Sequence, residues 1–399
     1  MSKPRTVTLV LCLPGGRVLG ALPAFPVAVP WWPDVAAVVA GALERYGTDV
    51  TVLRLLSADV GQMMQGGPVT YLAQVGTAPS HPLQAWPDDP AADAPHRLSY
   101  ARPGGPDADL AWADDALAGL GRRRTAPAEQ MRTWNLSSIW RLPTAQGPVW
   151  LKVVPPFFAH EGAILAVLDP AVVPRLLATA DGRMLMDDVP GADQYDAPVA
   201  LLLRMVGLLV DLQAAWAGRV GELIELGLPD WRAARFTVLA GDTVRRSATQ
   251  LDRATLSRLD VLLNRLPARL AAIAACGLAD TLVHGDFHPG NVHGSDEALV
   301  LLDWGDCGVG HPLLDQAAFT GRLTDSARAE VRTEWARLWR AAVPGSEPER
   351  AAVLIEPVAA LRQALIYQHF LDNIEEDEQV YHVHDPVAWL QRAGARAGP

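Results

Sequence analysis

The chain has 399 residues, of which 50% are hydrophobic and 20% are charged, and its formal net charge is −11. At about 100–200 residues per domain, this length indicates two or three domains with sizeable cores. Because half of the residues are apolar without a period, collagen-like and disordered chains are excluded. The acidic balance repels a phosphate backbone, so we expect no nucleic-acid partner.

The cysteines and the apolar runs indicate the compartment. Three widely separated cysteines, at positions 12, 276 and 307, fit neither a disulfide framework nor a zinc site, and free thiols are typical of a reducing compartment. The apolar run at residues 7–13 ends at a Pro-Gly-Gly turn without a signal-peptide cleavage pattern. No window approaches 18 consecutive apolar residues. We therefore expect a cytoplasmic protein with no membrane partner, and the oligomeric state stays open.

The first 120 residues predict a small module of mixed secondary structure. Alternating or continuous apolar residues indicate strands, and apolar residues at helical spacing indicate helices. A run with five prolines indicates a long loop. In chain order we predict a strand at 6–13, a helix at 34–46 that stops at Gly47, strands at 50–56 and 69–75, a loop at 76–96 and a helix at 110–120.

A second pattern begins at about residue 128, where strands come first and helices follow. The strand-rich part has strands at 133–142 and 149–154 joined by a turn at 143–148, a short helix at 161–168 and a strand at 183–189. The later part has helices at 199–217, 248–275, 325–342 and 351–374, interrupted by a strand-rich insertion at 281–302.

The densest chemical signal lies in the insertion, where residues 282–292 read LVHGDFHPGNV and residues 299–305 read LVLLDWG. A strand-like run leads into each polar segment, so Asn291 and Asp303 would face each other across a hairpin, with Asp286 nearby. Phosphoryl transfer requires a carboxylate that orients the acceptor hydroxyl and oxygen ligands for Mg²⁺. The spacing of these three residues therefore favours phosphoryl transfer.

Lysine usage supplies an independent signal. The chain has 34 basic residues, and only Lys3 and Lys152 are lysines. Lys152 lies within an apolar strand, where a compact ammonium suits a contact with phosphate. Glu161 follows at the start of the next predicted helix and is a candidate partner for Lys152. The alternatives are an ordinary strand lysine and a helix acid favoured by the helix dipole.

These segments resemble the aminoglycoside phosphotransferase and choline kinase-like family, a branch of the protein-kinase fold. The resemblance covers residues 128–399, from the HGDFHPGN and LDWG motifs through Gly310-His311-Pro312 and Asp315. It implies that Asp286 is the catalytic base and that Asn291 and Asp303 bind Mg²⁺. His284 is expected to support the loop rather than carry protons.

The same resemblance implies a nucleotide site. Lys152 would bind the phosphates of ATP, with GTP left open, and Glu161 would hold Lys152. Residues 186–189 would form the hinge that receives the adenine, and this hinge includes Asp188 and Val189. The loop expected to cover the nucleotide, residues 133–139, contains no glycine, and its candidate phosphate contacts are Ser137 and Ser138. The chain also has His311 where the family often has aspartate.

The first module resembles the Nudix fold in outline, from Leu22 to Gly47. Ala40 and Gly41 stand where the Nudix motif has an Arg-Glu pair, and Glu44 alone remains of its acids. A lone carboxylate does not hold the Mg²⁺ ions that Nudix hydrolysis requires, so we expect a scaffold without hydrolase activity.

The predicted fold class is therefore α+β, with a Nudix-like α/β module at 1–120, a kinase small lobe at 128–190 and a helical large lobe at 191–399. The predicted function is ATP- and Mg-dependent phosphorylation of a hydroxyl group on a small molecule. The alternative is a non-catalytic nucleotide-binding regulatory protein of the same fold, because the glycine-free loop could fail to support transfer.

The acceptor is expected to be an amino sugar or another amine-bearing molecule. Residues 372–378 are the most acidic stretch of the chain, and they include Glu375 and Glu376. Acids of the helical lobe would bind a cationic amino group. The alternative for this stretch is a solvated acidic helix end.

Overall fold

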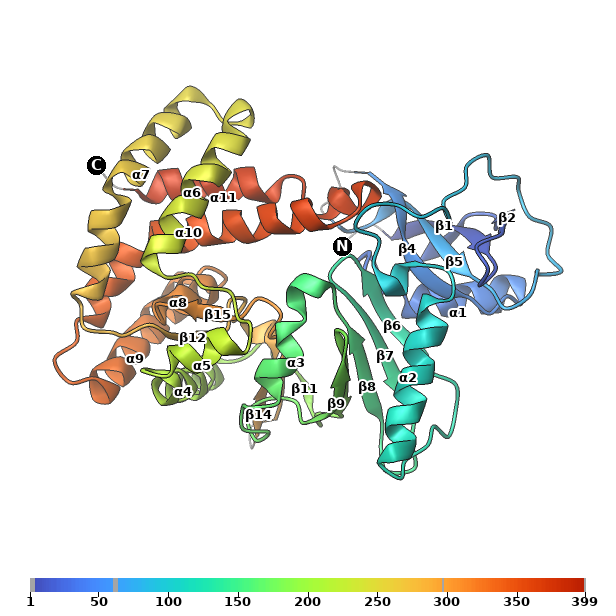
Figure 1. Ribbon diagram of the computed structural model, residues 1–399, viewed down its shortest axis with the longest axis horizontal. Helices are drawn as coiled ribbons and strands as arrows, with labels where there is room; N and C mark the ends of the chain where they lie inside the picture. The colour runs from blue at the N-terminus through green and yellow to red at the C-terminus, as the bar shows by residue number, and fades with distance from the viewer. Residues whose placement is uncertain (1–3, 60–63, 296–297, 398–399) are drawn as a thin grey trace. The chain divides into compact units, whose positions relative to one another are not determined.

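The computed structural model describes residues 4–59, 64–295 and 298–397. They form two compact units. Figure 1 labels the helices and strands of both. The first unit comprises the chain through residue 159 together with residues 176–188 and 371–383. The second comprises residues 160–175, 189–370 and 384 onward. The first unit thus joins the predicted N-terminal module with the predicted small-lobe sheet, and it takes in one segment from the predicted large lobe.

The N-terminal part of the first unit is built on a mixed five-stranded sheet. Its strand order is β2-β1-β5-β4, with β3 also paired to β1. β1 runs parallel to β5, from Arg5 opposite Gly67 to Cys12 opposite Gln74. The strands are β1 (Arg5–Cys12), β2 (Val18–Ala21), β3 (Phe25–Val27), β4 (Thr51–Ala58) and β5 (Gly67–Gln74), and the helix is α1 (Ala36–Tyr46).

These elements confirm the predicted strands at 6–13, 50–56 and 69–75 and the predicted helix at 34–46. α1 packs on the sheet through Val38 and Ala42, and it ends at Gly47 in the left-handed conformation that a helix C-cap favours. β2 and β3 were not predicted, because three- and four-residue strands are too short to show an alternating pattern.

The second sheet of the first unit is antiparallel throughout, with the order β6-β7-β8-β10-β9. α2 (Gly105–Gly119) packs against it through Ala113 and Leu117. Gln130 connects β6 to the first sheet, because its side-chain amide bonds to both the N–H and the carbonyl of Val52 on β4. The strands are β6 (Glu129–Trp134), β7 (Ser137–Leu142), β8 (Val149–Val153), β9 (Leu176–Ala180) and β10 (Arg183–Asp187).

The prediction of one strand at 133–142 is wrong. The chain turns at Asn135 and Leu136, so that Trp134 pairs with Ser137 and the segment forms the β6–β7 hairpin. Asparagine is a favoured turn residue, but apolar side chains flank it on both sides and conceal the turn.

The second unit is mainly helical. Its helices are α3 (His160–Leu165), α4 (Val199–Trp216), α5 (Val220–Glu225), α6 (Ala233–Ser247), α7 (Arg253–Ala274), α8 (Leu313–Thr320), α9 (Asp325–Ala342), α10 (Pro348–Asn373, of which residues from 371 belong to the first unit) and α11 (Asp385–Arg396). Two small sheets carry the loops of interest: β12 (Thr281–Val283) pairs with β15 (Gly308–Gly310), and β11 (Ala192–Asp193), β13 (Val292–Gly294) and β14 (Leu299–Leu301) form a three-stranded sheet.

Among the described residues, α4 is the one helix long and apolar enough to cross a membrane by length and composition. Its side chains Leu201, Met205 and Leu209 are buried inside the structure. Core helices of soluble proteins share these properties.

Candidate active site

β12 delivers the first polar segment of the site. Beyond Val283 the chain forms a loop that carries Asp286, and Phe287 anchors this loop from the next position. Phe287 is fully buried and stacks on Phe319 of α8 with ring centroids 4.7 Å apart, and its edge meets Trp335 of α9. Burial of a large aromatic ring fixes the loop, so the neighbouring carboxylate of Asp286 has a defined position.

The β13–β14 hairpin brings the second polar segment to the first. Val292 pairs with Leu301, and the N–H of Leu302 donates to the carbonyl of Asn291 at 2.8 Å. Asn291 and Asp303 therefore lie at the same end of the hairpin, as the spacing predicts. Asp303 is exposed and has φ of 62°, in the left-handed region that non-glycine residues rarely adopt. Such conformations cluster at functional sites, where the surrounding structure enforces them.

Asp286 is held by three side chains of the second unit. The Asn291 amide Nδ2 donates to its carboxylate oxygen Oδ2 at 3.1 Å and to its main-chain oxygen at 2.9 Å. His288 Nε2 lies 3.4 Å from the same Oδ2. Arg322 Nη2 lies 3.7 Å from the other oxygen, Oδ1. The Asp286 side chain remains 36% exposed, so a ligand can reach it.

His284 is a support of the loop, as expected. It is fully buried, and its Nε2 lies 2.9 Å from the carbonyl of Leu302. A carbonyl only accepts, so Nε2 carries the proton. Burial lowers the pKa of His284 to about 4, which keeps the ring neutral at pH 7. His284 thus connects the Asp286 loop to the residue that precedes Asp303.

Asp315 of α8 holds the same loop from another side. Its carboxylate accepts from the main-chain N–H groups of His284 and Gly285, at 2.9 and 2.8 Å, and from the side chain of Gln213 at 2.8 Å. Burial raises its pKa to about 6, although the two main-chain donors oppose the shift. A charged acceptor makes strong bonds with main-chain N–H groups, so Asp315 fixes the backbone that leads to Asp286.

Glu161 has a contact that the sequence did not predict. It is 2% exposed, and its Oε1 accepts from the main-chain N–H of Trp304 at 3.1 Å. Glu161 belongs to the second unit, whereas Lys152 belongs to the first. The pairing of Glu161 with Lys152 stays a prediction. The structure shows Glu161 bonded to Trp304, which follows Asp303.

Lys152 lies on β8, the middle strand of the second sheet, opposite Ile139 and Met184. It is 8% exposed. An ammonium this buried requires a charged or polar partner. Its position within an apolar strand agrees with the sequence pattern, and its role toward phosphate stays a prediction.

Ser137 and Ser138 are both buried on β7. Ser138 is fully buried and Ser137 is 6% exposed. Their hydroxyl oxygens accept from the indoles of Trp140 and Trp134, at 3.0 and 3.2 Å. Both serines belong to β7 rather than to an open loop. Their contact with phosphate stays a prediction.

The predicted hinge follows the end of β10. Asp187 pairs with Arg122 at 2.6 Å, and the carboxylate of Asp188 accepts from the indole of Trp150 at 2.6 Å. Asp188 ends its segment of the first unit and Val189 begins the next segment of the second. A change of unit between these two residues is compatible with a hinge, and contact with adenine stays a prediction.

The donor set at Asn291 and Asp303 suits Mg²⁺. Mg²⁺ prefers oxygen ligands and is commonly held by one or two protein side chains together with substrate phosphates. Asn291 uses its amide nitrogen on Asp286, so its carbonyl oxygen is not spent on that contact. Within the described part of the chain, no group of three or more His, Cys, Asp or Glu side chains could hold a metal ion by itself. A two-ligand site completed by phosphate oxygens fits this arrangement.

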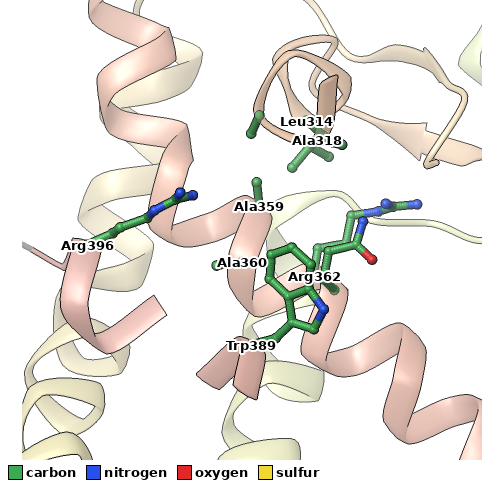
Figure 2. A pocket seen from close by; sticks show the side chains of 9 residues that line it. Leu314, Ala318, Ala359, Ala360, Arg362, Trp389 and Arg396 are labelled. Atoms are coloured by element: carbon green, nitrogen blue, oxygen red, sulfur yellow. The ribbon is translucent and has the colours of Figure 1, made fainter. Parts of the chain in front are cut away.

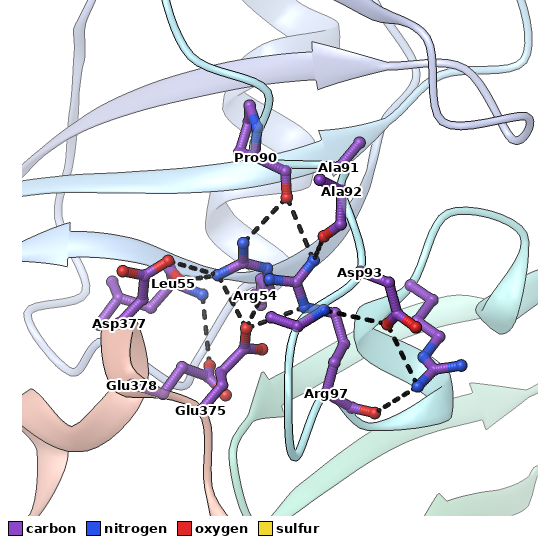
Figure 3. A network of polar contacts seen from close by, with 12 residues as sticks. Arg54, Leu55, Pro90, Ala91, Ala92, Asp93, Arg97, Glu375, Asp377 and Glu378 are labelled. Carbon is purple, nitrogen blue, oxygen red and sulfur yellow. Dashed lines mark hydrogen bonds and ion pairs between the residues drawn. The ribbon is translucent and has the colours of Figure 1, made fainter.

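The acidic stretch at 372–378 does not lie in the helical unit. Residues 371–383 belong to the first unit, where Glu375 is buried and pairs with Arg54 at 3.3 Å and Arg97 at 2.7 Å (Figure 3). Two guanidinium groups thus neutralise Glu375. The expectation that Glu375 binds a substrate amine is therefore wrong, because its charge is already compensated.

Sequence reasoning missed two arginines of the second unit. Arg322 lies just beyond α8, next to Asp286, and Arg362 lies in the middle of α10. Arg362, like Asp315, is a buried charged side chain that bonds to the backbone next to Asp286. In the sequence, Arg362 is distinguished only by its apolar neighbours in α10. An arginine on the exposed side of a helix can have the same neighbours.

Comparison with known proteins identifies relatives of the part of the chain that carries this site. The model of the phosphotransferase enzyme family matches residues 132–354, more than half of the chain. The solved structure of macrolide 2′-phosphotransferase from Brachybacterium faecium covers 72% of this chain and 98% of its own, with a TM-score of 0.50 at 17% identity. Macrolide 2′-phosphotransferase type I covers 73% and 97%, with a TM-score of 0.51 at 18% identity. No curated protein sequence matches the chain.

The family match confirms the phosphotransferase fold that the motifs imply, over residues 132–354. The comparisons do not show a Nudix fold for the N-terminal module, which stays a prediction. The matched region contains both polar segments and Lys152.

Proposed function

Because the chain belongs to the phosphotransferase enzyme family, we propose that it transfers the γ-phosphoryl group of ATP to a hydroxyl of a small molecule, with Mg²⁺. The observation that carries this proposal is the junction of the two polar segments. Asn291 bonds directly to Asp286, and the β13–β14 hairpin sets Asp303 beside Asn291. A base and two oxygen ligands at one place are what phosphoryl transfer requires.

Asp286 would act on the acceptor hydroxyl through one oxygen. Oδ2 accepts from Asn291 and faces His288, whereas the contact at Oδ1 is the longer one to Arg322. Oδ1 is therefore the oxygen that orients the hydroxyl and accepts its proton as the O–P bond forms. The Arg322 guanidinium, close to this oxygen, would stabilise charge that develops on the phosphoryl group.

Asn291 and Asp303 would hold Mg²⁺ through their side-chain oxygens. When bound, the ion neutralises charge on the phosphate oxygens of ATP. The left-handed backbone at Asp303 and the contact of Glu161 with the next N–H fix the direction of that carboxylate. Lys152 would contact the phosphates, with Glu161 as its partner, and the backbone at Asp188 and Val189 would receive the base. GTP is the alternative nucleotide.

For the acceptor we propose a hydroxyl-bearing molecule with an amino group, such as an amino sugar. Support comes from the second unit rather than from Glu375. Burial raises the pKa of Tyr367 on α10, and the negative charges of Asp385, Asp286 and Asp306 raise it further. The second unit thus carries negative charge that acts on this side chain of α10. A cationic acceptor would be attracted to negative charge near the base.

We also propose that the protein acts in the cytoplasm. Cys12, Cys276 and Cys307 are all free and buried. Free buried thiols are compatible with a reducing compartment. The net charge of −11 gives no support for nucleic acid as a partner.

The test is a transfer assay on the full chain. ATP or GTP with Mg²⁺ is incubated with an aminoglycoside, a macrolide, choline and a neutral sugar, and mass spectrometry detects phosphate monoesters. A product with an amine-bearing acceptor, and a lower yield with the neutral sugar, supports the proposal. Tight Mg-nucleotide binding without any product would instead favour the non-catalytic regulatory alternative.

A further inference from the structure

We propose that Arg362 is a positioning residue for phosphoryl transfer, because its guanidinium bridges the loop that carries Asp286 and the loop that follows Asp303. Nη1 donates to the carbonyl of Gly285 at 3.0 Å, and Nη2 donates to the carbonyl of Asp306 at 2.8 Å. Gly285 immediately precedes Asp286. This inference rests on the proposed function.

The two loops approach each other closely, and the guanidinium donates to a carbonyl of each. Gly285 has φ of 93°, and a Cβ built on it would lie 2.0 Å from the carbonyl oxygen of Asp306. Carbonyl oxygens repel each other, and buried carbonyls need donors. The planar fork of a guanidinium can donate to two acceptors at once, and an ammonium on a flexible stem cannot reproduce this geometry.

Arg362 is held in place for this role. It is 2% exposed, and its guanidinium lies 5.1 Å from the centre of the Trp231 ring. Its neighbour Gln363 also donates to the carbonyl of Gly285, at 3.3 Å. Burial lowers the pKa of Arg362, and the negative charges of Asp306, Asp315 and Asp286 oppose that shift. The buried cation is thus compensated by the carboxylates of the site that it supports.

The bridge complements the contact of Asp315. Asp315 accepts from the main-chain N–H of Gly285, and Arg362 donates to the carbonyl of the same residue. Both polar groups of one peptide segment are thereby fixed by buried charged side chains. The orientation of Asp286, the next residue, depends on both. Misplacement of a reacting group by about 1 Å can cost on the order of 10²-fold in rate.

A cavity beside α10 makes the proposal testable by chemical rescue. Its lining includes Arg362, Gln363, Ala359, Leu314, Trp389 and Arg396 (Figure 2). Removal of the Arg362 side chain would extend this cavity to the two carbonyls, so that a free guanidinium ion could enter. Arg396 lines the same cavity but is exposed at the end of α11, and it supplies a matched control.

The experiment uses the full chain with Arg362→Ala, Arg362→Lys and Arg396→Ala. For Arg362→Ala we expect kcat to fall by about 10²-fold with the KM for Mg-ATP within about threefold of wild type. Millimolar guanidinium should restore at least about a tenth of the lost kcat in a saturable manner. Arg362→Lys should not restore it, and Arg396→Ala should match wild type with and without guanidinium.

Hydrogen exchange gives a readout that does not depend on turnover. Peptides that cover residues 284–287 and 304–307 should exchange faster in Arg362→Ala and Arg362→Lys, and added guanidinium should slow exchange in Arg362→Ala. Unchanged exchange in both segments, or kcat within threefold of wild type, overturns the inference. If wild type transfers no phosphate to any acceptor, the proposed function fails, while exchange still decides whether Arg362 bridges the loops.

Discussion

The side-chain amide of Asn291 donates to the carboxylate of Asp286, with 3.1 Å between Nδ2 and Oδ2. Asn291, one of the two residues proposed to hold Mg²⁺, therefore also orients Asp286, the proposed base. Loss of the Asn291 side chain should affect turnover as well as metal binding. Loss of the Asp303 carboxylate should act mainly on the binding of the magnesium nucleotide.

The positive φ of Asp303 predicts that two substitutions weaken nucleotide binding alike but differ in stability. Asp303→Ala and Asp303→Gly both remove the carboxylate, so both should weaken Mg-nucleotide binding. Glycine adopts φ of 62° without the strain that alanine incurs there, which amounts to about 1–2 kcal/mol. The glycine variant should therefore be the more stable of the two in urea unfolding. Equal stability, or nucleotide titrations that superimpose on wild type, contradict this account of Asp303.

The cluster at Glu375 predicts a stability difference between two neighbouring acids. Glu375 is buried against Arg54 and Arg97, whereas Asp377 pairs with Arg54 but is 49% exposed. Glu375→Gln removes the carboxylate that pairs with the buried Arg97, and it should cost about 3–5 kcal/mol in unfolding free energy. Asp377→Asn should cost less than about 1 kcal/mol. Urea unfolding of both variants measures this, and equal losses are incompatible with the buried cluster.

Glu378 predicts a pH dependence of stability. Burial raises its pKa to about 8 from 4.5, and the charge of Glu375 adds to the shift while Arg54 opposes it. The folded chain then keeps a proton that the unfolded chain loses. Stability from this group is full below about pH 4.5 and declines as pH rises toward 8, by at most about 1.4 kcal/mol per pH unit. Thermal unfolding between pH 5 and 8 should decline less steeply in Glu378→Gln, and parallel curves contradict the assignment.

Local sequence patterns predicted the strands and loops that carry the site. They did not predict the role of a side chain whose partners are distant in the sequence. The strand-loop-strand pattern around Asp286 and Asp303 needs only neighbouring residues, so its geometry was predictable. The role of Glu375 was not, because its partners Arg54 and Arg97 lie hundreds of residues away in the chain. An acidic run reads as a solvated helix end unless those partners are known.

The same limit applies to Arg362 and Ser138. Arg362 bonds to Gly285 over a separation of 77 residues, and nothing in its helical context predicts that contact. Ser138 reads as part of a loop, but the two-residue turn at Asn135 and Leu136 places it inside a strand. The register of a hairpin depends on its turn. When the turn is predicted one residue away from its true place, a side chain is assigned to the wrong face of the sheet.

The N-terminal module should show no Nudix-type hydrolysis. Glu44 is exposed on α1, and Gly41, which stands at an acidic position of the motif, packs on Phe25 with space for little more than hydrogen. The assay incubates full-length Asp286→Asn with ADP-ribose and Mg²⁺ and monitors AMP release. We expect no release above the buffer control. Release that is lost on a further Glu44→Gln substitution contradicts the prediction.

The most direct test of the central claim is the turnover of Asp286→Asn, with whichever acceptor wild type phosphorylates. The asparagine keeps an oxygen for the Asn291 amide but cannot accept a proton from the hydroxyl. We predict that kcat falls by about 10²–10⁴-fold, while the dissociation constant for Mg-ATP stays within about twofold of wild type. A kcat within a few-fold of wild type contradicts Asp286 as the base.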